Sequence, residues 1–413
     1  MDKCEGMLKF VLHNNHYYKN VIKEFNIADP LSITQYPVLT RNELQKNRYN
    51  MFSSGYKSKY FNQQLRRQAS SGSTGVPINV YWDYKDYYIS NMFLWRKRLS
   101  WYGIHPNEKY VMFTLDSFNI DNNRSDEVQY IIEKNKLVIN VTLLFSLEQY
   151  KKVVSIIKDF DPVWLYIQPS ILNKLLQVCK EKNYVISNSL RYIESVGELL
   201  TSDLRRQVDK YFKVPIANMY GSEEMNCIAL ECPNHHMHII SENVHIEVKN
   251  ENGIFDSGEG DAIITNLNNH CMPLIRYDQG DKILLNKQPE TCSYDQKYMS
   301  IDLIEGRIRD CIIIDGVEIN SFMLAEVISE VNNQLNDLII GYNYFYYSSR
   351  QVLCCKIFID KKFDSWFPVV QNRIHSIFIS KLPKNTSCNF QVIQANKFEC
   401  NNLKNKVLKI IEG

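Results

Sequence analysis

An apolar run passes into small and acidic residues at positions 214–224, which read VPIANMYGSEE. Residues 214–219 are apolar enough to form a buried strand, and Tyr220 and Gly221 follow them directly. When such strands lie parallel in a sheet, ligands bind beyond their carboxyl ends. The pattern therefore predicts a binding site at Tyr220 and Gly221.

Strands and helices alternate in the same way upstream of this run. Continuous apolar runs at 110–115 and 163–167 are typical of strands buried on both faces of a sheet, and residues 190–196 are a further strand candidate. Apolar residues recur at helical spacing over 172–179, and a second helix is expected over 201–212. This β-α-β-α-β order predicts an α/β fold with a parallel sheet and right-handed crossovers.

The remainder of the chain differs in pattern. Alternating residues and glycine turns over 239–285 predict antiparallel hairpins, and a loop of small residues at 70–77 leads into a strand at 78–82. Residues 305–413 read as a separate small α+β unit. We therefore expect two domains: a large N-terminal domain over 1–304, with parallel α/β sheets plus antiparallel hairpins, and a small C-terminal α+β domain over 305–413.

The composition is that of an ordinary globular protein. The chain has 413 residues, of which 45% are hydrophobic and 23% charged, and its formal net charge is +2. So small a charge gives no long-range field to hold nucleic acid or an anionic membrane, and no apolar run reaches the ~18 residues of a membrane span. Eleven scattered cysteines without a CxxC pair, and an N-terminus without a signal peptide, favour a cytoplasmic setting. We expect neither nucleic acid nor a membrane as a partner.

Glycines and hydroxyl residues make up one short segment, which consists of Ser70, Ser71, Gly72, Ser73, Thr74 and Gly75. Backbone N–H groups and hydroxyls in such a loop can surround phosphate oxygens. The segment lacks the Gly-Lys-Ser/Thr ending of a Walker loop and the spacing of a dinucleotide fingerprint. On these residues alone, a plain polar loop is the alternative interpretation.

Three further motifs follow this loop in order: 218–224 (NMYGSEE), 275–281 (IRYDQGD) and 305–310 (EGRIRD). From about residue 35 to its end, the chain resembles the adenylate-forming superfamily of acyl-CoA synthetases and adenylation domains. Within it, the phenylacetate-CoA ligase branch and its capsule-biosynthesis relatives are most similar. The resemblance implies ATP- and Mg²⁺-dependent activation of a carboxylic acid to an acyl-adenylate, with release of pyrophosphate. It also implies acyl transfer to coenzyme A, or alternatively to an amine or a carrier protein.

The resemblance gives each motif residue an expected role. The nucleotide would be held by the loop 70–75 on its phosphates, by Gly197, Glu198, Asn218, Tyr220 and Gly221 around the adenine, and by Asp281 and Arg307 on the ribose hydroxyls. Tyr220 would stack on the adenine face, which is a favourable contact between planar groups. Glu224 would carry Mg²⁺, a hard cation that prefers carboxylate and phosphate oxygens.

Three positions depart from the pattern of that superfamily. Glu223 stands where a Thr or Ser usually contacts the α-phosphate, and Ser222 is the alternative source of that hydroxyl. Val76 lies where a lysine is frequent, and Leu403 where a glycine is usual. A second carboxylate beside a phosphate is unfavourable unless it points away or helps to hold the metal. The alternative hypothesis is therefore a degenerate member that binds a nucleotide or an acyl ligand without turnover.

The C-terminal region supplies the remaining expected residues. Lys404 aligns with the lysine that stabilises charge on the carboxylate and the α-phosphate, and Lys406 is the second candidate. A solvated surface lysine is the alternative for each. Arg309 falls at the hinge position of the superfamily, so the resemblance implies a mobile C-terminal domain.

One group of potential metal ligands lies outside these motifs. Within seven residues the chain places Cys232, His235, His236 and His238, with Cys227 and Cys271 as further candidates. Cysteine and histidine at such spacing can bind zinc. A second pair of ligands with regular spacing is not evident, so a polar turn before the hairpins is the alternative.

Overall fold

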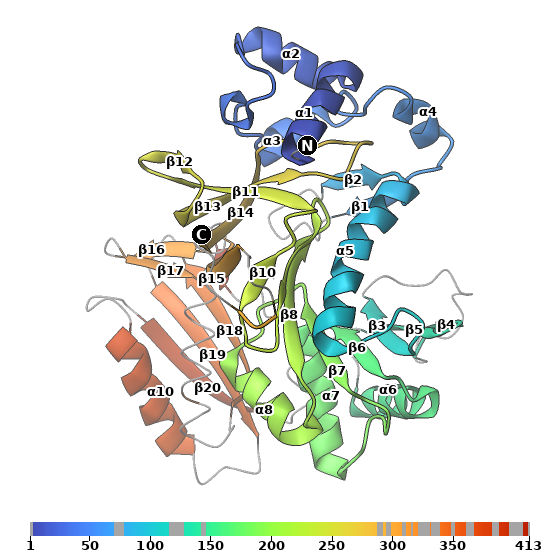
Figure 1. Cartoon of the computed structure of the whole chain (residues 1–413). Helices are drawn as coiled ribbons and strands as arrows, with labels where there is room; N and C mark the ends of the chain where they lie inside the picture. The colour runs from blue at the N-terminus through green and yellow to red at the C-terminus, as the bar shows by residue number, and fades with distance from the viewer. Residues whose placement is uncertain are drawn as a thin grey trace. The chain divides into compact units, whose positions relative to one another are not determined.

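The computed structural model describes residues 3–69, 78–114, 128–141, 146–286, 292–294, 299–307, 311–314, 317–320, 331, 339–347, 352–360, 367–381, 388–395 and 408–411. Its helices are α1 (Lys3–Asn14), α2 (His16–Glu24), η1 (Ile33–Gln35), α3 (Arg41–Asn47), α4 (Tyr56–Phe61), α5 (Tyr84–Tyr102), α6 (Leu147–Phe160), α7 (Pro169–Lys182), α8 (Ser202–Phe212) and α10 (Phe367–Lys381). Its strands up to residue 231 are β1 (Arg66–Ala69), β2 (Asn79–Trp82), β3 (Tyr110–Thr114), β4 (Tyr130–Glu133), β5 (Lys136–Asn140), β6 (Trp164–Ile167), β7 (Tyr192–Val196), β8 (Ile216–Ser222) and β9 (Asn226–Glu231). The later strands are β10 (Met237–Ile239), β11 (Val244–Asn250), β12 (Gly253–Phe255), β13 (Gly258–Asn266), β14 (Tyr277–Asn286), β15 (Ser300–Arg307), β16 (Cys311–Ile314), β17 (Val317–Asn320), β18 (Ile339–Tyr347), β19 (Val352–Asp360), β20 (Cys388–Ala395) and β21 (Leu408–Ile411) (Figure 1).

The chain divides into two compact units, one of residues 1–105 and 219–304 and the other of residues 106–218 and 305–413. It crosses between them after residues 105, 218 and 304. The sequence also predicted two parts, but as consecutive domains, whereas each observed unit consists of two separate segments. The expected domain border at 304/305 stays a prediction.

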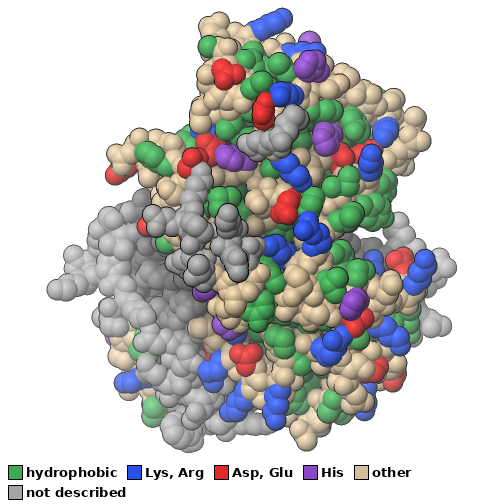
Figure 2. Space-filling model, viewed as in Figure 1, with side chains coloured by type: hydrophobic (Ala, Val, Ile, Leu, Met, Phe, Trp, Pro, Cys, Tyr) green, Lys and Arg blue, Asp and Glu red, His purple; other side chains and the backbone are tan. Residues whose placement is uncertain are grey.

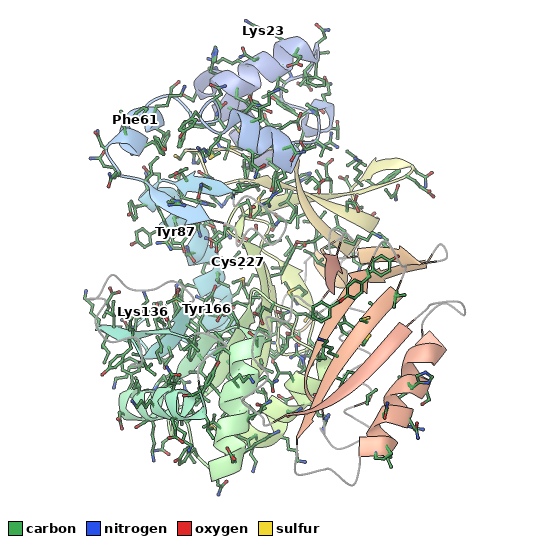
Figure 3. The ribbon with its side chains drawn as sticks, turned by 180° about the vertical axis from the view of Figure 1, so that it is seen from behind. Lys23, Phe61, Tyr87, Lys136, Tyr166 and Cys227 are labelled. Carbon is green, nitrogen blue, oxygen red and sulfur yellow. The ribbon has the colours of Figure 1, made fainter. Side chains whose placement is uncertain are left out.

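The second unit contains the parallel sheet. Its strands run in the order β7-β6-β3-β5-β4, and β3 pairs in parallel with both β5 and β6, as β6 does with β7. The segments expected as strands are β3, β6 and β7, and the expected helices are α7 and α8, so the α/β prediction is confirmed. Val111, Leu165 and Ile193 are fully buried between these layers. Figure 3 labels Lys136 on β5 and Tyr166 on β6 of this sheet.

Two strands of this sheet were not expected from the sequence. β4 and β5 form an antiparallel hairpin, and β4 is the edge strand. Residues of β4 such as Tyr130 and Ile132 are exposed, so the run lacks the buried pattern of the inner strands. The edge strand β4 therefore gives a weak signal, whereas β5 has a short buried apolar run at 137–139 that we did not single out.

The first unit contains the antiparallel hairpins. Its strands run in the order β12-β11-β13-β14-β15-β10-β9-β8, and β9, β11, β12 and β13 form antiparallel pairs with their neighbours. The expected hairpins are therefore confirmed. The strand expected over 214–219 is β8, which continues to Ser222. Tyr220 and Gly221 thus lie inside the strand, and not after its end as the sequence suggested.

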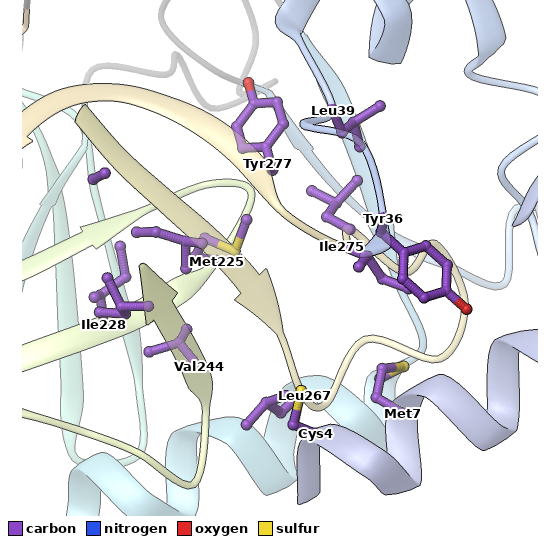
Figure 4. Close-up of a cluster of buried hydrophobic side chains, with 14 of the residues drawn as sticks. Cys4, Met7, Tyr36, Leu39, Met225, Ile228, Val244, Leu267, Ile275 and Tyr277 are labelled. Atoms are coloured by element: carbon purple, nitrogen blue, oxygen red, sulfur yellow. The ribbon is translucent and has the colours of Figure 1, made fainter. Parts of the chain in front are cut away.

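Residues near the N-terminus complete the core of the first unit. Met7 of α1 is buried in this core. Figure 4 shows Tyr36 and Leu39 beside Ile275 and Tyr277, the residues that lead into β14. The backbone N–H of Leu39 donates to the carbonyl of Arg276 at 2.9 Å, so the N-terminal segment fixes the start of β14.

The C-terminal strands form a hairpin and a four-stranded sheet. β16 pairs with β17, and the sheet has the order β20-β19-β18-β21. Its central pair β18–β19 is antiparallel, and each edge strand is parallel to its neighbour. With α10 this gives the α+β composition that the sequence predicted.

Two surface properties bear on the expected partners. Among the described residues, no helix is both long enough and apolar enough to cross a membrane. On the face shown in Figure 2, basic and acidic side chains are interspersed.

Candidate functional site

The site begins with the tight hairpin between β8 and β9. Gly221 is required there because a Cβ atom would lie 2.4 Å from the backbone oxygen of Asn226. Asn226 has a φ of 62°, and the N–H of Met225 donates to Oγ of Ser222 at 3.1 Å. The three-residue loop 223–225 is thereby fixed between the two strands.

A bulge in β14 faces this hairpin from another part of the sequence. The register of the β13–β14 pair shifts so that one residue of β13 lies opposite residues 279–281 of β14. Gly280 has a φ of 78°, and its N–H donates to Oδ1 of Asp278 at 3.0 Å. Bulges of this kind turn side chains out of the regular alternation of a strand. Here the bulge presents Gln279 and Asp281 to the hairpin.

Two side-chain hydrogen bonds connect the hairpin to the bulge. The hydroxyl of Tyr220 donates to Oδ2 of Asp281 at 2.7 Å. The hydroxyl of Ser222 donates to Oε1 of Gln279 at 3.2 Å. The structure thus brings together Tyr220, Gly221, Ser222 and Asp281, all of which were expected at one site.

A third segment reaches the hairpin through Glu223. The side-chain amide of Gln68 on β1 donates to Oε2 of Glu223 at 2.9 Å. Gln68 lies two positions before the glycine- and serine-rich loop, whose residues 70–77 are outside the described part of the chain. β1 and β2 flank that loop and pair from Ala69↔Asn79 onward. The carboxylate that departs from the superfamily pattern is therefore exposed and hydrogen-bonded beside the start of the expected phosphate loop.

Glu224 is held differently from its neighbour. Its residue surface is only 4% exposed, and its backbone carbonyl accepts a hydrogen bond of 3.2 Å from the side-chain amide of Asn266. The carboxylates of Glu223 and Glu224, neighbours in the sequence, are the hard oxygen ligands that Mg²⁺ prefers. The residues present therefore fit the expected metal, although the role of Glu224 stays a prediction.

Arg276 anchors this site, and we did not single it out from the sequence. Its guanidinium donates from Nε and Nη2 to both carboxylate oxygens of Glu247 at 2.9 Å, and from Nη1 to the backbone carbonyls of Thr34 and Tyr36. The side chains of Arg276 and Glu247 are 6% and 3% exposed. Arg276 has a φ of 51°, so a strained backbone position is stabilised by a fully bonded ion pair just before the bulge. Arg276 could have been singled out from the sequence because it is the basic residue within the 275–281 motif.

The expected adenine-binding residues of the second unit follow β7. Gly197 has a φ of 73°, which suits a glycine at a sharp turn. The carboxylate of Glu198 accepts hydrogen bonds of 2.9 Å from both the backbone N–H and the hydroxyl of Ser170, at the first turn of α7. Glu198 therefore stabilises the start of a helix in this structure. Asn218 lies on β8, one residue before Met219.

Several expected residues are not tested by the described part of the chain. Arg307 is the last residue of β15, and its role stays a prediction. The loop residues 70–75, Val76, Arg309, Leu403, Lys404 and Lys406 lie outside the described residues.

The candidate metal ligands at 232–238 divide into two sets. Cys232, His236 and His238 lie together, and Cys292 joins them from a distant part of the sequence. His235 is outside this group, and its Nδ1 lies 2.9 Å from Oε1 of Glu231. Cys227 and Cys271, the other cysteines considered, are buried elsewhere in the unit.

Comparisons with known proteins agree with the motifs. The family model "AMP-binding enzyme" matches residues 68–253, which include the hairpin described above. Protein CapK of Staphylococcus aureus is 22% identical over 97% of this chain and 88% of its own length. The phenylacetate-coenzyme A ligase of Thermus thermophilus is 29% identical over 41% of this chain and 39% of its own length.

A comparison with solved structures also shows the fold of an acyl-CoA ligase. The 2-hydroxyisobutyryl-CoA ligase, determined with a bound acyl-AMP, matches with a TM-score of 0.74 and 12% identity over 100% of this chain and 88% of that one. Residues 68–253 thus match the family model of AMP-binding enzymes, and the resemblance to the adenylate-forming superfamily is confirmed. The chain has the fold of the acyl-CoA ligases in that superfamily.

Proposed function

We propose that the chain uses Mg·ATP to convert a carboxylic acid to an acyl-adenylate and pyrophosphate, and then transfers the acyl group to coenzyme A. The hydrogen bond between Tyr220 and Asp281 is the main support. It joins two motifs 61 residues apart, and the nucleotide would contact both.

In this proposal, Tyr220 and Asp281 hold the nucleoside. The ring of Tyr220 packs against the adenine face. A carboxylate has several acceptor positions, so Asp281 can accept from Tyr220 and from a ribose hydroxyl at the same time. Their mutual hydrogen bond fixes both groups before the nucleotide arrives, which lowers the entropic cost of binding.

The reaction itself needs positioning and charge neutralisation. An oxygen of the substrate carboxylate attacks the α-phosphorus, the bond from that phosphorus to the bridging oxygen breaks, and pyrophosphate leaves with the electron pair. Glu224 holds Mg²⁺, which when bound neutralises phosphate charge. Lys404 adds positive charge at the forming anhydride. No protein nucleophile is required, because orientation supplies much of the rate.

The test measures ATP–pyrophosphate exchange by the full chain over a panel of aliphatic and aromatic acids. This exchange reports the first step, so it does not depend on the acyl acceptor. We expect one or more acids to raise exchange well above the no-acid background. Coenzyme A, amines and an acyl-carrier protein, added with the active acid, then identify the acceptor by product mass.

Asp281→Ala and Glu259→Ala form a matched pair for this assay. Asp281→Ala should abolish exchange, whereas Glu259→Ala removes an exposed carboxylate of the neighbouring strand β13 and should retain it. Measurable ATP binding without exchange for any acid would instead support the second candidate, a member that binds without turnover. The observation that favours that candidate is the exposed carboxylate of Glu223 in the expected phosphate region.

A further inference from the structure

Four thiol and imidazole side chains meet at a point that the proposed reaction does not use. We call Cys232, His236, His238 and Cys292 the Cys–His cluster. One potential ligand atom from each of the four lies within 4.8 Å of the others. Two cysteines and two histidines are the donor set of a common class of closed zinc sites.

A compact turn arranges the first three members. β9 ends at Glu231, and the N–H of Cys232 donates to the carbonyl of His236 at 2.9 Å. His235, with a φ of 63°, directs the backbone through the turn. His236 and His238 are two positions apart at the start of β10, so their side chains share a face of the strand, with ring centroids 6.4 Å apart.

The two sulfurs are separated as a metal would require. Sγ of Cys232 lies 3.8 Å from Sγ of Cys292. A tetrahedral ion with zinc–sulfur bonds of about 2.3 Å places two sulfur ligands about 3.8 Å apart. A disulfide needs a bond of about 2.05 Å, so these thiols are not joined.

The cluster is largely closed off from water. Cys232 and His238 are fully buried, and Cys292 is 3% exposed. The side-chain amide of Asn234 donates to the sulfur of Cys292 at 3.7 Å.

The last turn of α5 supports both halves of the cluster. The ring of Trp101 lies 4.8 Å from that of His238, and its Nε1–H donates to the carbonyl of Tyr294 at 3.2 Å. The hydroxyl of Tyr102 donates to the carbonyl of Glu231 at 2.7 Å. These contacts fix the backbones that carry the ligands, as supporting residues do around structural metal sites.

We propose that the Cys–His cluster binds one zinc ion in a closed, structural Cys₂His₂ site. The ion would tie the β9–β10 turn to the segment that carries Cys292. Because β9 is one arm of the hairpin that holds Tyr220, the site would stabilise the scaffold without contacting substrate. Cys227, labelled in Figure 3, lies on β9 and contacts the carbonyl of Ala229 instead.

A second group of possible ligands does not support such a proposal. His245, Glu247 and Asp256 lie near one another, but the carboxylate of Glu247 is already paired with Arg276. A cation there would compete with a buried ion pair that holds the β14 bulge.

The test is the zinc content of the full chain, purified without added metal or chelator and measured by plasma mass spectrometry. We expect one zinc per chain, and its loss in Cys232→Ser and Cys292→Ser. Two variants serve as controls: His235→Ala removes the neighbouring imidazole, and Cys354→Ser removes a thiol elsewhere. Both should keep full zinc. Zinc-free wild-type protein, or full zinc in both ligand variants, would overturn the proposal.

Cobalt substitution keeps the proposal testable if the ligand variants fail to fold. Wild-type chain refolded with Co²⁺ should show the intense visible bands of a tetrahedral ion and a near-ultraviolet thiolate-to-cobalt band. Weak octahedral bands without the thiolate band would contradict the site, as would a Cys232–Cys292 disulfide in the purified protein. Zinc removal should also lower the melting temperature, a readout independent of the ligase reaction.

Discussion

The hydroxyl of Tyr220 donates a 2.7 Å hydrogen bond to Oδ2 of Asp281, and so joins β8 to the bulge of β14. Neither strand alone could place both groups, because Gly221 allows the close approach in the β8–β9 hairpin and Gly280 allows the bulge. The bond therefore depends on two backbone features in separate motifs. A nucleoside site that depends on this bond should be disturbed by small backbone changes in either the β8–β9 hairpin or the β14 bulge.

Replacing Tyr220 by Phe should weaken AMP binding about fivefold to tenfold, which corresponds to about 1–1.4 kcal/mol. The ring remains for the adenine, but Asp281 loses the donor that orients it. Tyr220→Ala should weaken binding further because the stacking surface is lost as well. Isothermal titration calorimetry with AMP measures both. Tyr102→Phe removes a hydroxyl that bonds Glu231 in the same unit and should leave AMP affinity unchanged; equal affinity for Tyr220→Phe and wild type would refute the arrangement.

Replacing Glu223 by Thr should raise the exchange rate and the affinity for ATP. The substitution removes an exposed negative charge near the expected phosphates and supplies the hydroxyl that relatives have there. Gln68→Ala tests the bond between this carboxylate and β1 and should lower the affinity for ATP, because that bond no longer draws Glu223 toward Gln68. A rate lost in Glu223→Thr would instead assign Glu223 to the metal, and a magnesium titration would then show a raised requirement.

The ion pair of Arg276 and Glu247 should be a large contributor to stability. Removing one partner leaves the other charge buried, which typically costs about 3–5 kcal/mol. Arg276→Met should therefore lower the midpoint of urea unfolding strongly. Glu247→Leu combined with Arg276→Met should cost less than the sum of the single changes, because no lone charge remains. Additive effects would show that the carbonyls of Thr34 and Tyr36, and not Glu247, are the important partners.

Much of the fold could be predicted because its signals are local. Continuous apolar runs identified β3 and β6, the candidate segment 190–196 proved to contain β7, and helical spacing identified α7. Helix α1 was not singled out although its buried residues Cys4, Met7, Leu8 and Val11 recur at helical spacing. Helix α2 buries only Tyr18 and Val21, so its local signal is weaker.

The candidate site likewise contains residues that local motifs identified and contacts that only the fold creates. The sequence motifs identified Tyr220 and Asp281 as candidate residues. The hydrogen bond between them, however, depends on the bulge at Gly280, which arises from the register of the β13–β14 pair. Cys292 could not be selected from the sequence, since it reaches Cys232 only through the fold. His235 was grouped with its neighbours, whereas its positive φ places it on Glu231.

Variants of the two C-terminal lysines should differ clearly in their rates of ATP–pyrophosphate exchange. Lys404→Ala is expected to lower acid-dependent exchange by at least about 100-fold, as loss of a transition-state charge does. ATP binding and folding should be almost unchanged, because the lysine acts on the reacting phosphate. Lys406→Ala is the matched control. If Lys406→Ala is the inactive variant, the alignment is shifted by two residues; if both are active, the anhydride forms without a lysine.

The central claim is that Tyr220 and Asp281 form one nucleoside site, and a crystal structure of the chain with AMP tests it most directly. We predict the adenine against the ring of Tyr220 and the ribose hydroxyls within hydrogen-bonding distance of the Asp281 carboxylate. AMP bound elsewhere, with the Tyr220–Asp281 bond intact and no nucleotide beside it, would contradict the account.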